Sequence, residues 1–474
     1  MAAEPAHAWQ RALADYRAGR LEEAARGCRR LLETQPAHAD ALHLLGAIAH
    51  ARGAADEAVG LIEQAARLAP DRAEFLNTLG VAYLAQGRAA EAEDCLRGAL
   101  ALDARSADAH NNLGIALREL GRRAEAEASL RQAIALRANF AEAHNNLGNL
   151  LRETGRAKEA EASYRRALRL RPAYAEAHAG LGATLRELGH LDEAARCAER
   201  AIALRPHYAE AHNDLGAALF GLGRLAQAEH AYRAALDLDP DLAIARANLA
   251  YLLNCVPGRA PEEVFAAHRE AAGTLGAAPD PRPHANDPDP DRRLRVGYVS
   301  ADLRRHSVAF FFEPLLENHD RRAVEPFCYA ASARADEITA RLQQHCAHWC
   351  EAYTLDDARL AERIRADRID ILVDLSGLSA GNRLAALARK PAPVQVTWLG
   401  YPNTTGLEAM DWRLTDALAD PPGRTERFHV EKLLRLPRGF LCYRPPEEAP
   451  EVGELPLLRT GRLTFGCFNH LPKL

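Results

Sequence analysis

The sequence predicts an all-α superhelix of short repeats, followed by an α/β lobe of the Rossmann-like type. Two observations lead to this prediction. The first half of the 474-residue chain repeats a pattern of Leu, Gly and Ala every 34 residues. Beyond a Pro-rich segment, short apolar runs alternate with helical stretches, as in a parallel sheet covered by helices. A chain of 474 residues is also too long for a single ordinary domain.

The composition is that of a folded protein without a strong electrostatic preference for nucleic acid or membranes. Hydrophobic residues make up 48% and charged residues 26%, with a net charge of −5. No apolar stretch is long enough to span a bilayer, and the first residues lack the apolar core of a signal peptide. The nine cysteines are scattered and odd in number, which indicates free thiols in a reducing compartment. We therefore expect a cytoplasmic protein that binds neither nucleic acid nor membranes.

Four columns of residues keep the 34-residue spacing across the first 250 residues. They are Leu45, Leu79, Leu113, Leu147, Leu181, Leu215 and Leu249; Gly19, Gly53, Gly87, Gly121, Gly155, Gly189 and Gly223; Ala24, Ala58, Ala92, Ala126, Ala160, Ala194 and Ala228; and Pro36, Pro70, Pro172, Pro206 and Pro240, with Ala104 and Ala138 in the two gaps. Several columns in phase indicate a repeat architecture rather than chance.

Each column has a mechanical reason. Apolar residues three and four apart predict two amphipathic helices in every unit, and the Gly lies where the first helix must end. The Ala lets the two helices approach closely, and the Pro ends the second helix. One helix pair cannot bury its own apolar face, so neighbouring pairs must stack. Residues 5–255 therefore resemble a tetratricopeptide repeat (TPR) array of about seven units.

One polar column points to a binding role for the array. The residues before the repeated Leu are Thr78, Asn112, Asn146, Gly180, Asp214 and Asn248. Side-chain amides repeated on an inner face can bind the backbone of an extended peptide. The alternative is that these amides satisfy helix ends or contact water. The histidines that open many units lie one repeat apart, so we expect packing residues rather than metal ligands.

The second half begins after a connector. Residues 256–293 contain a helical stretch and then a Pro- and Asp-rich linker. From residue 294 short apolar runs alternate with helical stretches, the pattern of a doubly wound sheet. The predicted strands are 294–301, 325–332, 369–377, 393–402, 411–416 and 463–469, and the predicted helices are 336–346 and 360–368. Since ligands of such sheets bind at the carboxyl ends of strands, the loops 300–307, 376–383 and 400–406 are the candidate site.

The residues themselves limit the chemistry of these loops. None of the three matches a dinucleotide or P-loop pattern, so they indicate only a ligand-binding α/β domain. His306 follows a predicted strand and is a candidate general base, with an ordinary surface histidine as the alternative. The segment HCAHWC at 345–350 has no second pair of ligands, and a helical turn and a half is the expected structure there. We expect no metal site.

Five segments in order resemble a known family. LRVGYVSADLRRHS, ILVDLSGLSAGNR, PAPVQVTWLGYPNTTG, MDWRLTD and FGCFNHLPKL, after a TPR array, resemble the O-linked N-acetylglucosamine transferases and SPINDLY-like proteins, the family 41 glycosyltransferases. The bacterial members are most similar. The resemblance covers nearly the whole chain and is carried most specifically by WLGYP and its flanks.

The resemblance implies a fold, an activity and site residues. The fold is GT-B, in which residues 294–461 are the N-terminal Rossmann-like lobe and residues 462–474 begin the C-terminal lobe. The activity is inverting hexosyl transfer from UDP-N-acetylglucosamine (UDP-GlcNAc) to Ser or Thr of proteins, with no metal or other cofactor. His306 and Lys473 match catalytic positions, and Leu399, Gly400 and Pro402 match the loop that borders the donor sugar. Asn112, Asn146, Asp214 and Asn248 match the ladder that binds acceptor peptides.

Departures from the family pattern qualify these expectations. Leu378 replaces an aromatic residue or His near the sugar, and Gly180, Thr78 and Asp214 interrupt the asparagine ladder. The chain stops soon after the second lobe begins, so we expect this chain alone to be inactive, because the site is built across two lobes. Two alternatives stay open. The chain could be a non-catalytic TPR adaptor, or it could transfer fucose from GDP-fucose as SPINDLY-like relatives do.

Overall fold

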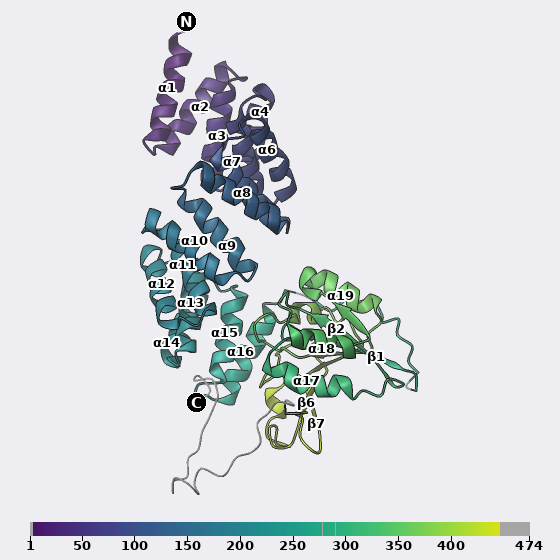
Figure 1. Ribbon diagram of the computed structural model, residues 1–474. Coiled ribbons are helices and arrows are strands. Elements are labelled where there is room, and N and C mark those ends of the chain that lie inside the picture. The colour runs from purple at the N-terminus through teal and green to yellow at the C-terminus, as the bar shows by residue number, and fades with distance from the viewer. Residues whose placement is uncertain (1–2, 277, 290, 446–474) are drawn as a thin grey trace. The chain divides into compact units, whose positions relative to one another are not determined.

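The structure is a computed structural model that describes residues 3–276, 278–289 and 291–445 (Figure 1). The chain divides into two compact units, Met1–Pro206 and His207–Leu474. The second unit therefore contains the last repeat helices together with the α/β lobe. The predicted classes of structure, an all-α repeat region and a Rossmann-like lobe, are both confirmed. The predicted domain limits stay predictions, and the border at residue 461 lies outside the described residues.

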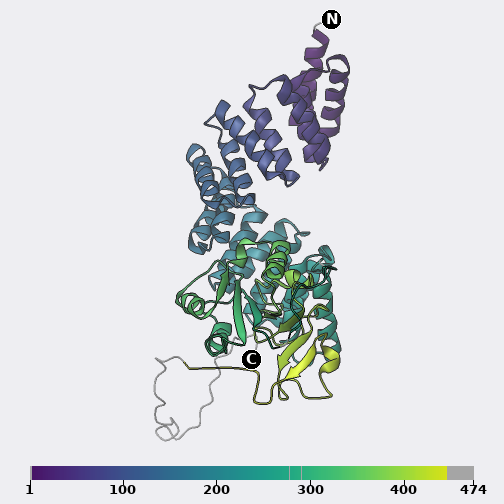
Figure 2. The ribbon, with the colours of Figure 1, turned by 90° about the vertical axis from the view of Figure 1, so that its right-hand side faces the viewer.

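The first unit consists of helical hairpins that follow one another as a stack (Figure 2). Its helices are α1 Ala3–Arg17, α2 Leu21–Thr34, α3 Ala39–Ala51, α4 Ala55–Leu68, α5 Ala73–Ala85, α6 Ala89–Leu102, α7 Ala107–Glu119, α8 Arg123–Leu136, α9 Ala141–Glu153, α10 Ala157–Leu170, α11 Ala175–Glu187 and α12 Leu191–Leu204.

Two glycines explain the hairpin in every described repeat after the first, which has Ala12 at the second position. The first, such as Gly121 with φ 76°, ends the first helix in the left-handed conformation that a side chain disfavours. The second, such as Gly114, lies inside that helix where the second helix comes closest. A Cβ on Gly114 would lie 2.6 Å from Leu130 Cγ, and Leu130 is fully buried. The repeated Leu-Gly pair therefore places a large side chain of one helix against the bare backbone of the other.

The second unit contains the remaining helices and one sheet. Its elements are α13 Ala209–Gly221, α14 Leu225–Leu238, α15 Ala243–Leu253, α16 Pro261–Gly273, β1 Leu294–Ser300, α17 Ser307–Glu317, β2 Val324–Ala330, α18 Glu337–His345, β3 His348–Cys350, η1 Ala352–Thr354, α19 Asp357–Ala366, β4 Ile371–Asp374, α20 Leu384–Ala388, β5 Val394–Thr397, β6 Trp412–Thr415, η2 Glu426–Phe428 and β7 Lys432–Arg435.

The seven strands form one parallel sheet in the order β3-β2-β1-β4-β5-β6-β7. Helices α17 and α18 cover one face, where Phe312 and Leu342 are fully buried. Helices α19 and α20 cover the other face, and α16 packs there as well through Ala271 and Ala272. The sheet is thus covered by helices on both faces, which explains why its strands are almost continuously apolar.

Three differences from the sequence expectations concern the sheet and its helices. Residues 348–350, which we expected in a helix, form the edge strand β3, because the helix ends at His345 and Trp349 pairs with Cys328. Strand β7 and helix α17 were not predicted. The predicted strand at 463–469 lies outside the described residues. Within the described residues, none of the helices is both long and apolar enough to cross a bilayer.

Candidate active site

The candidate site lies at the point where the sheet order reverses. From β1 the chain proceeds outward to β2 and β3, and from β4 it proceeds in the opposite direction to β5, β6 and β7. The loops after β1 and β4 therefore diverge and leave a crevice at the carboxyl edge, which is where such sheets bind ligands. Ser300 Oγ and Ser376 Oγ lie 3.4 Å apart at this point, and both residues are buried. The structure thus joins the first two predicted loops.

The loop after β1 places His306 at the start of α17. Its Nδ1 accepts a hydrogen bond from the Val308 backbone N–H at 3.3 Å, so His306 is the N-cap of the helix. Asp302 Oδ2 lies 3.7 Å from the same nitrogen. Because Nδ1 acts as an acceptor, the proton of the neutral ring is on Nε2. The His306 side chain is 38% exposed, so Nε2 is placed to donate a hydrogen bond to a ligand.

The loop after β4 is shaped by a buried carboxylate that sequence reasoning missed. Asp374 accepts hydrogen bonds from the backbone N–H groups of Ser376 and Gly377 at 3.1 and 2.8 Å and from Thr397 Oγ1 at 3.0 Å. Its burial raises the pKa of the carboxyl, although the three hydrogen bonds act in the opposite direction. Asp374 therefore ties the ends of β4 and β5 together. Leu378, the departure noted above, is buried in the core.

The loop after β5 has a tight turn at the residues expected to border the donor sugar. The Gly400 N–H donates to the Trp398 carbonyl at 2.8 Å, and Leu399 between them has φ 70°. This is a γ-turn of the positive-φ kind, which is rare and strained. A Cβ on Gly400 would lie 1.7 Å from the Leu375 carbonyl oxygen. Only glycine can therefore pass this close to the end of β4, and Pro402 follows at the exposed surface.

Two buried charged residues from β6 and the segment before β7 hold the rest of this loop. Arg413 donates to the Asn403 carbonyl at 2.6 Å and to the Tyr401 carbonyl at 3.2 Å. Glu431, only 3% exposed, accepts from Thr404 Oγ1 at 2.6 Å and from the Thr405 N–H at 2.7 Å. Sequence reasoning missed both residues, because their partners lie in an irregular loop 10 to 27 residues earlier, and no periodic pattern marks such contacts. The charge of Arg413 in a predicted buried strand was the available signal.

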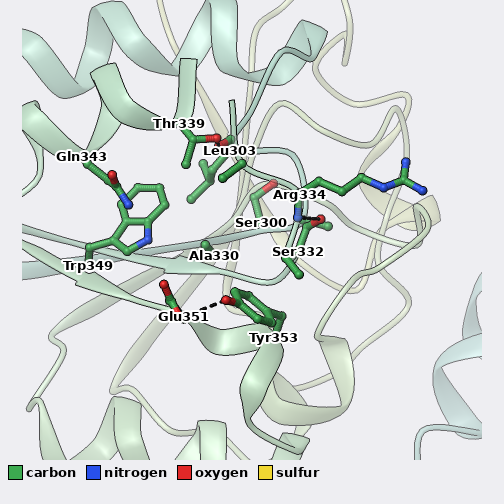
Figure 3. Close-up of a pocket in the computed structure, with 13 residues that line it drawn as sticks. Ser300, Leu303, Ala330, Ser332, Arg334, Thr339, Gln343, Trp349, Glu351 and Tyr353 are labelled. Atoms are coloured by element: carbon green, nitrogen blue, oxygen red, sulfur yellow. Dashed lines mark hydrogen bonds between the residues drawn. The ribbon is translucent and has the colours of Figure 1, made fainter. Parts of the chain in front are cut away.

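A small pocket lies beside the crevice, between the ends of β1, β2 and β3 (Figure 3). It has a volume of about 50 Å³, and the Tyr353 hydroxyl donates to Glu351 at its edge at 2.9 Å. Trp349 and Gln343 form another part of its wall. Pockets for drug-sized ligands have roughly 300–1,000 Å³. The pocket by itself is therefore too small for a nucleotide sugar.

The HCAHWC segment does not assemble a metal site. His348 Nε2 lies 2.9 Å from Glu325 Oε1, whereas Cys346 Sγ contacts the His348 carbonyl at 3.0 Å. His345 is directed to a different carboxylate, Glu317, at 3.5 Å. Within the described residues, no three His, Cys, Asp or Glu side chains are grouped so that they could hold a metal ion.

The asparagines of the array form a ladder between neighbouring repeats. Asn112 Nδ2 donates to Asn77 Oδ1 at 3.0 Å, and Asn146 Nδ2 donates to Asn111 Oδ1 at 2.9 Å. In the second unit Asn248 Nδ2 donates to Asn213 Oδ1 at 2.9 Å. The predicted column of asparagines thus donates hydrogen bonds to a second column of asparagines that lies one residue earlier in each repeat. Sequence reasoning missed this second column, although the Asn-Asn pair recurs in the sequence.

The ladder orients amides that are only partly buried. Asn111 and Asn145 are 6% and 4% exposed, whereas Asn112 and Asn146 are half-buried. One N–H of Asn146 is used by the neighbouring repeat, and each amide has two N–H groups and two acceptor lone pairs. Part of its hydrogen-bonding capacity therefore remains for a ligand. Asp214, on α13, is likewise half-buried.

The break in the ladder at Gly180 lies against a tyrosine ring. A Cβ on Gly180 would lie 2.5 Å from Tyr164 Cε1, and Tyr164 is fully buried. Corresponding positions in the preceding repeats carry Leu130, Leu96 and Ile62, which are smaller. In this repeat the Tyr164 ring therefore packs against the bare backbone of Gly180, whereas Asn248 is present in the repeat where Tyr232 holds the corresponding position. Lys473, the remaining predicted site residue, lies outside the described residues.

Comparisons with known proteins agree with this architecture. Residues 278–443 match the model of glycosyl transferase family 41, and models of tetratricopeptide repeats match residues 10–73, 71–139, 111–175, 179–243 and 214–279. The chain is therefore a TPR protein with a family 41 glycosyltransferase region. Its sequence is similar to those of SPINDLY and O-linked N-acetylglucosamine transferase proteins.

Individual relatives share only part of their length with this chain. A probable UDP-N-acetylglucosamine–peptide N-acetylglucosaminyltransferase SPINDLY from Petunia hybrida is 46% identical over 193 residues, which cover 40% of this chain and 21% of that protein. The protein of the same description from Oryza sativa is 41% identical over 235 residues, covering 48% and 25%. The chain thus spans about a quarter or less of the curated relatives it matches. A solved mutant of the Thermobaculum terrenum O-GlcNAc transferase superposes with a TM-score of 0.66 at 38% identity, covering 71% of this chain and 64% of that one.

Proposed function

We propose that this protein transfers N-acetylglucosamine from UDP-GlcNAc to Ser or Thr hydroxyls of proteins, with the acceptor held by the repeats. The observation that carries the proposal is the convergence of three loops at the reversal of the sheet. These loops carry His306, the Ser300–Ser376 contact and the strained turn at Leu399. The names of the SPINDLY and O-GlcNAc transferase relatives support the donor and the acceptor class.

We assign the roles in this reaction from the geometry of the loops and from the resemblance to the family. The acceptor hydroxyl oxygen attacks C1 of the sugar, the bond from C1 to the phosphate oxygen breaks, and UDP leaves with inversion, while the hydroxyl proton passes to water or to the departing diphosphate. His306 Nε2–H faces solvent and would donate a hydrogen bond at the sugar rather than remove a proton, because Nδ1 is occupied by the Val308 N–H. Leu399, Gly400 and Pro402 would border the sugar, and Lys473 would contact the diphosphate.

The acceptor is proposed to bind along the asparagine ladder. Asn112, Asn146 and Asn248 each donate to the preceding repeat, so their amides are oriented before a ligand arrives. Such preorganised amides lower the entropic cost of binding an extended peptide backbone. Asp214 would contact the same backbone. We also propose a cytoplasmic location, which the free cysteines of the described residues support.

The test compares donors. The 474-residue chain and a form that carries both lobes of the expected GT-B fold are each incubated with an acceptor protein extract and either UDP-GlcNAc or GDP-fucose. Mass spectrometry then identifies the sugar added to Ser or Thr. We expect N-acetylhexosamine from the form with both lobes. Deoxyhexose would favour the fucosyltransferase alternative. Peptide binding without transfer from either donor would favour the TPR adaptor and would overturn the proposal.

A further inference from the structure

The donor-sugar loop is anchored in the last repeat helices through Tyr401. This residue lies between Gly400 and Pro402, yet its side chain is only 3% exposed and points into the second unit. Its hydroxyl lies 2.8 Å from His268 Nε2 on α16 and 3.2 Å from Asn254 Nδ2 at the end of α15. The loop and the repeat helices are therefore joined by a side chain that is flanked by two residues of the sugar-bordering turn.

The direction of each hydrogen bond in this cluster is determined. The Nδ1–H of His268 donates to the Val264 carbonyl at 2.7 Å, so Nε2 is the acceptor for the Tyr401 hydroxyl. That hydroxyl in turn accepts from Asn254 Nδ2, and Asn254 Oδ1 accepts from Asn403 Nδ2 at 2.8 Å. His268 is fully buried. A chain of donors and acceptors with one arrangement specifies one conformation of the loop.

Close backbone contacts restrict the loop on two sides. A Cβ on Gly377, in the loop after β4, would lie 2.2 Å from the Tyr401 Cβ. A Cβ on Gly406 would lie 2.3 Å from the His268 carbonyl oxygen. The loop is thus in contact with β4 on one side and with α16 on the other, and its two anchors are far apart in the sequence.

We propose that His268 and Asn254 are positioning residues that set the conformation of the 399–402 turn through the Tyr401 hydroxyl. The end of the repeat array is then part of the scaffold of the transfer site, and not merely a neighbour of it. The proposal rests on the proposed transfer function for its catalytic consequence, but the coupling itself is a property of this chain.

The test removes one oxygen atom. Tyr401→Phe keeps the ring and deletes the hydroxyl, which leaves the buried His268 acceptor and the Asn254 donor without this partner. The matched control is Tyr251→Phe on α15, whose ring lies 5.9 Å from that of Tyr401. A second variant, His268→Gln, retains a hydrogen-bond acceptor. It should therefore show little of the loosening of the loop that His268→Leu produces.

The first measurement is hydrogen exchange of residues 399–406 in the 474-residue chain without donor. We expect exchange about tenfold faster in Tyr401→Phe and His268→Leu than in wild type, and wild-type exchange in Tyr251→Phe. Equal exchange in Tyr401→Phe and its control would overturn the coupling. Global unfolding is recognised separately, because it would also speed exchange in β1 and β4.

The second measurement is sugar transfer by a form of the protein that carries both lobes of the expected GT-B fold. We expect Tyr401→Phe to lower kcat while the KM for the acceptor stays unchanged, because the repeats that bind the acceptor are intact. Faster exchange with an unchanged kcat would overturn the positioning role. If wild-type protein transfers no sugar, the proposed function fails. The hydrogen-exchange result alone then still decides whether His268 and Asn254 determine the conformation of the 399–402 turn.

Discussion

The repeat array and the α/β lobe obtain their folds in different ways. In the array, each contact that orders a hairpin joins residues within about one repeat, such as Gly114 and Leu130. In the lobe, the decisive contacts join residues that are far apart, such as His268 with Tyr401 and Asn254 with Asn403. Local contacts can be read from periodicity, whereas distant contacts depend on topology. The functional loops of this chain belong to the second kind.

The largest expected effect contrasts two glycines, one in each region. Gly400→Ala would put a methyl group 1.7 Å from the Leu375 carbonyl oxygen, so the lobe should lose more than about 3 kcal/mol of unfolding free energy. Gly60→Ala in α4 meets nothing within 4 Å and should instead stabilise the array by about 1 kcal/mol.

Tryptophan fluorescence in urea measures the first change, because three of the four tryptophans, Trp349, Trp398 and Trp412, lie in the lobe. Hydrogen exchange in α4 measures the second. If Gly400→Ala had the urea midpoint of the wild type, the loop after β5 would be able to accommodate the added methyl group, and the prediction would be wrong.

The next effect tests the buried contact between the two regions by pH. Burial lowers the pKa of His268 to about 4, while the Glu431 carboxylate raises it slightly and His429 and Arg413 lower it further. The folded state thus favours neutral imidazole. Stability is fully present above the unfolded pKa of about 6.5 and is lost as the pH falls toward about 4. Between about pH 7 and about pH 5 the loss should be about 2 kcal/mol.

The control for this prediction is His268→Gln, which cannot titrate but keeps a polar side chain. Its second unit should lose less stability than wild type over the same pH interval, because the carboxylates that also titrate are common to both proteins. Denaturant unfolding of the lobe at the two pH values checks this. Identical losses in the two proteins would contradict a neutral buried His268.

The smallest effect lies in the array. Asn146→Ala removes one ladder hydrogen bond and leaves the buried Asn111 oxygen without this donor, so α7 to α10 should lose about 1 kcal/mol of protection. Affinity for an acceptor peptide should fall as well. Exchange in those helices and fluorescence titration of a labelled peptide measure the two changes. The control is Gln132→Ala at an exposed position of α8. Equal peptide affinities of the two variants would show that the ladder does not contribute to peptide binding.

Much of the site could be predicted from the sequence, but its assembly could not. The loops at 300–307, 376–383 and 400–406 were expected from their places after apolar strands. The carboxylate that joins two of them, Asp374, was missed because its partner Thr397 belongs to a different strand. Strand β3 was also missed, since three residues at a sheet edge carry no periodic signal.

The sequence by itself determined the repeat fold, five of the lobe's seven described strands and the resemblance to the family. These follow from spacing, because a helical hairpin and a buried strand each leave a local pattern of apolar residues. Only the tertiary structure decided how the amides of successive repeats pair, what packs against Gly180 and what holds the loop after β5. Those features arise when atoms distant in the chain compete for the same space or share one hydrogen bond, and no local pattern records that competition.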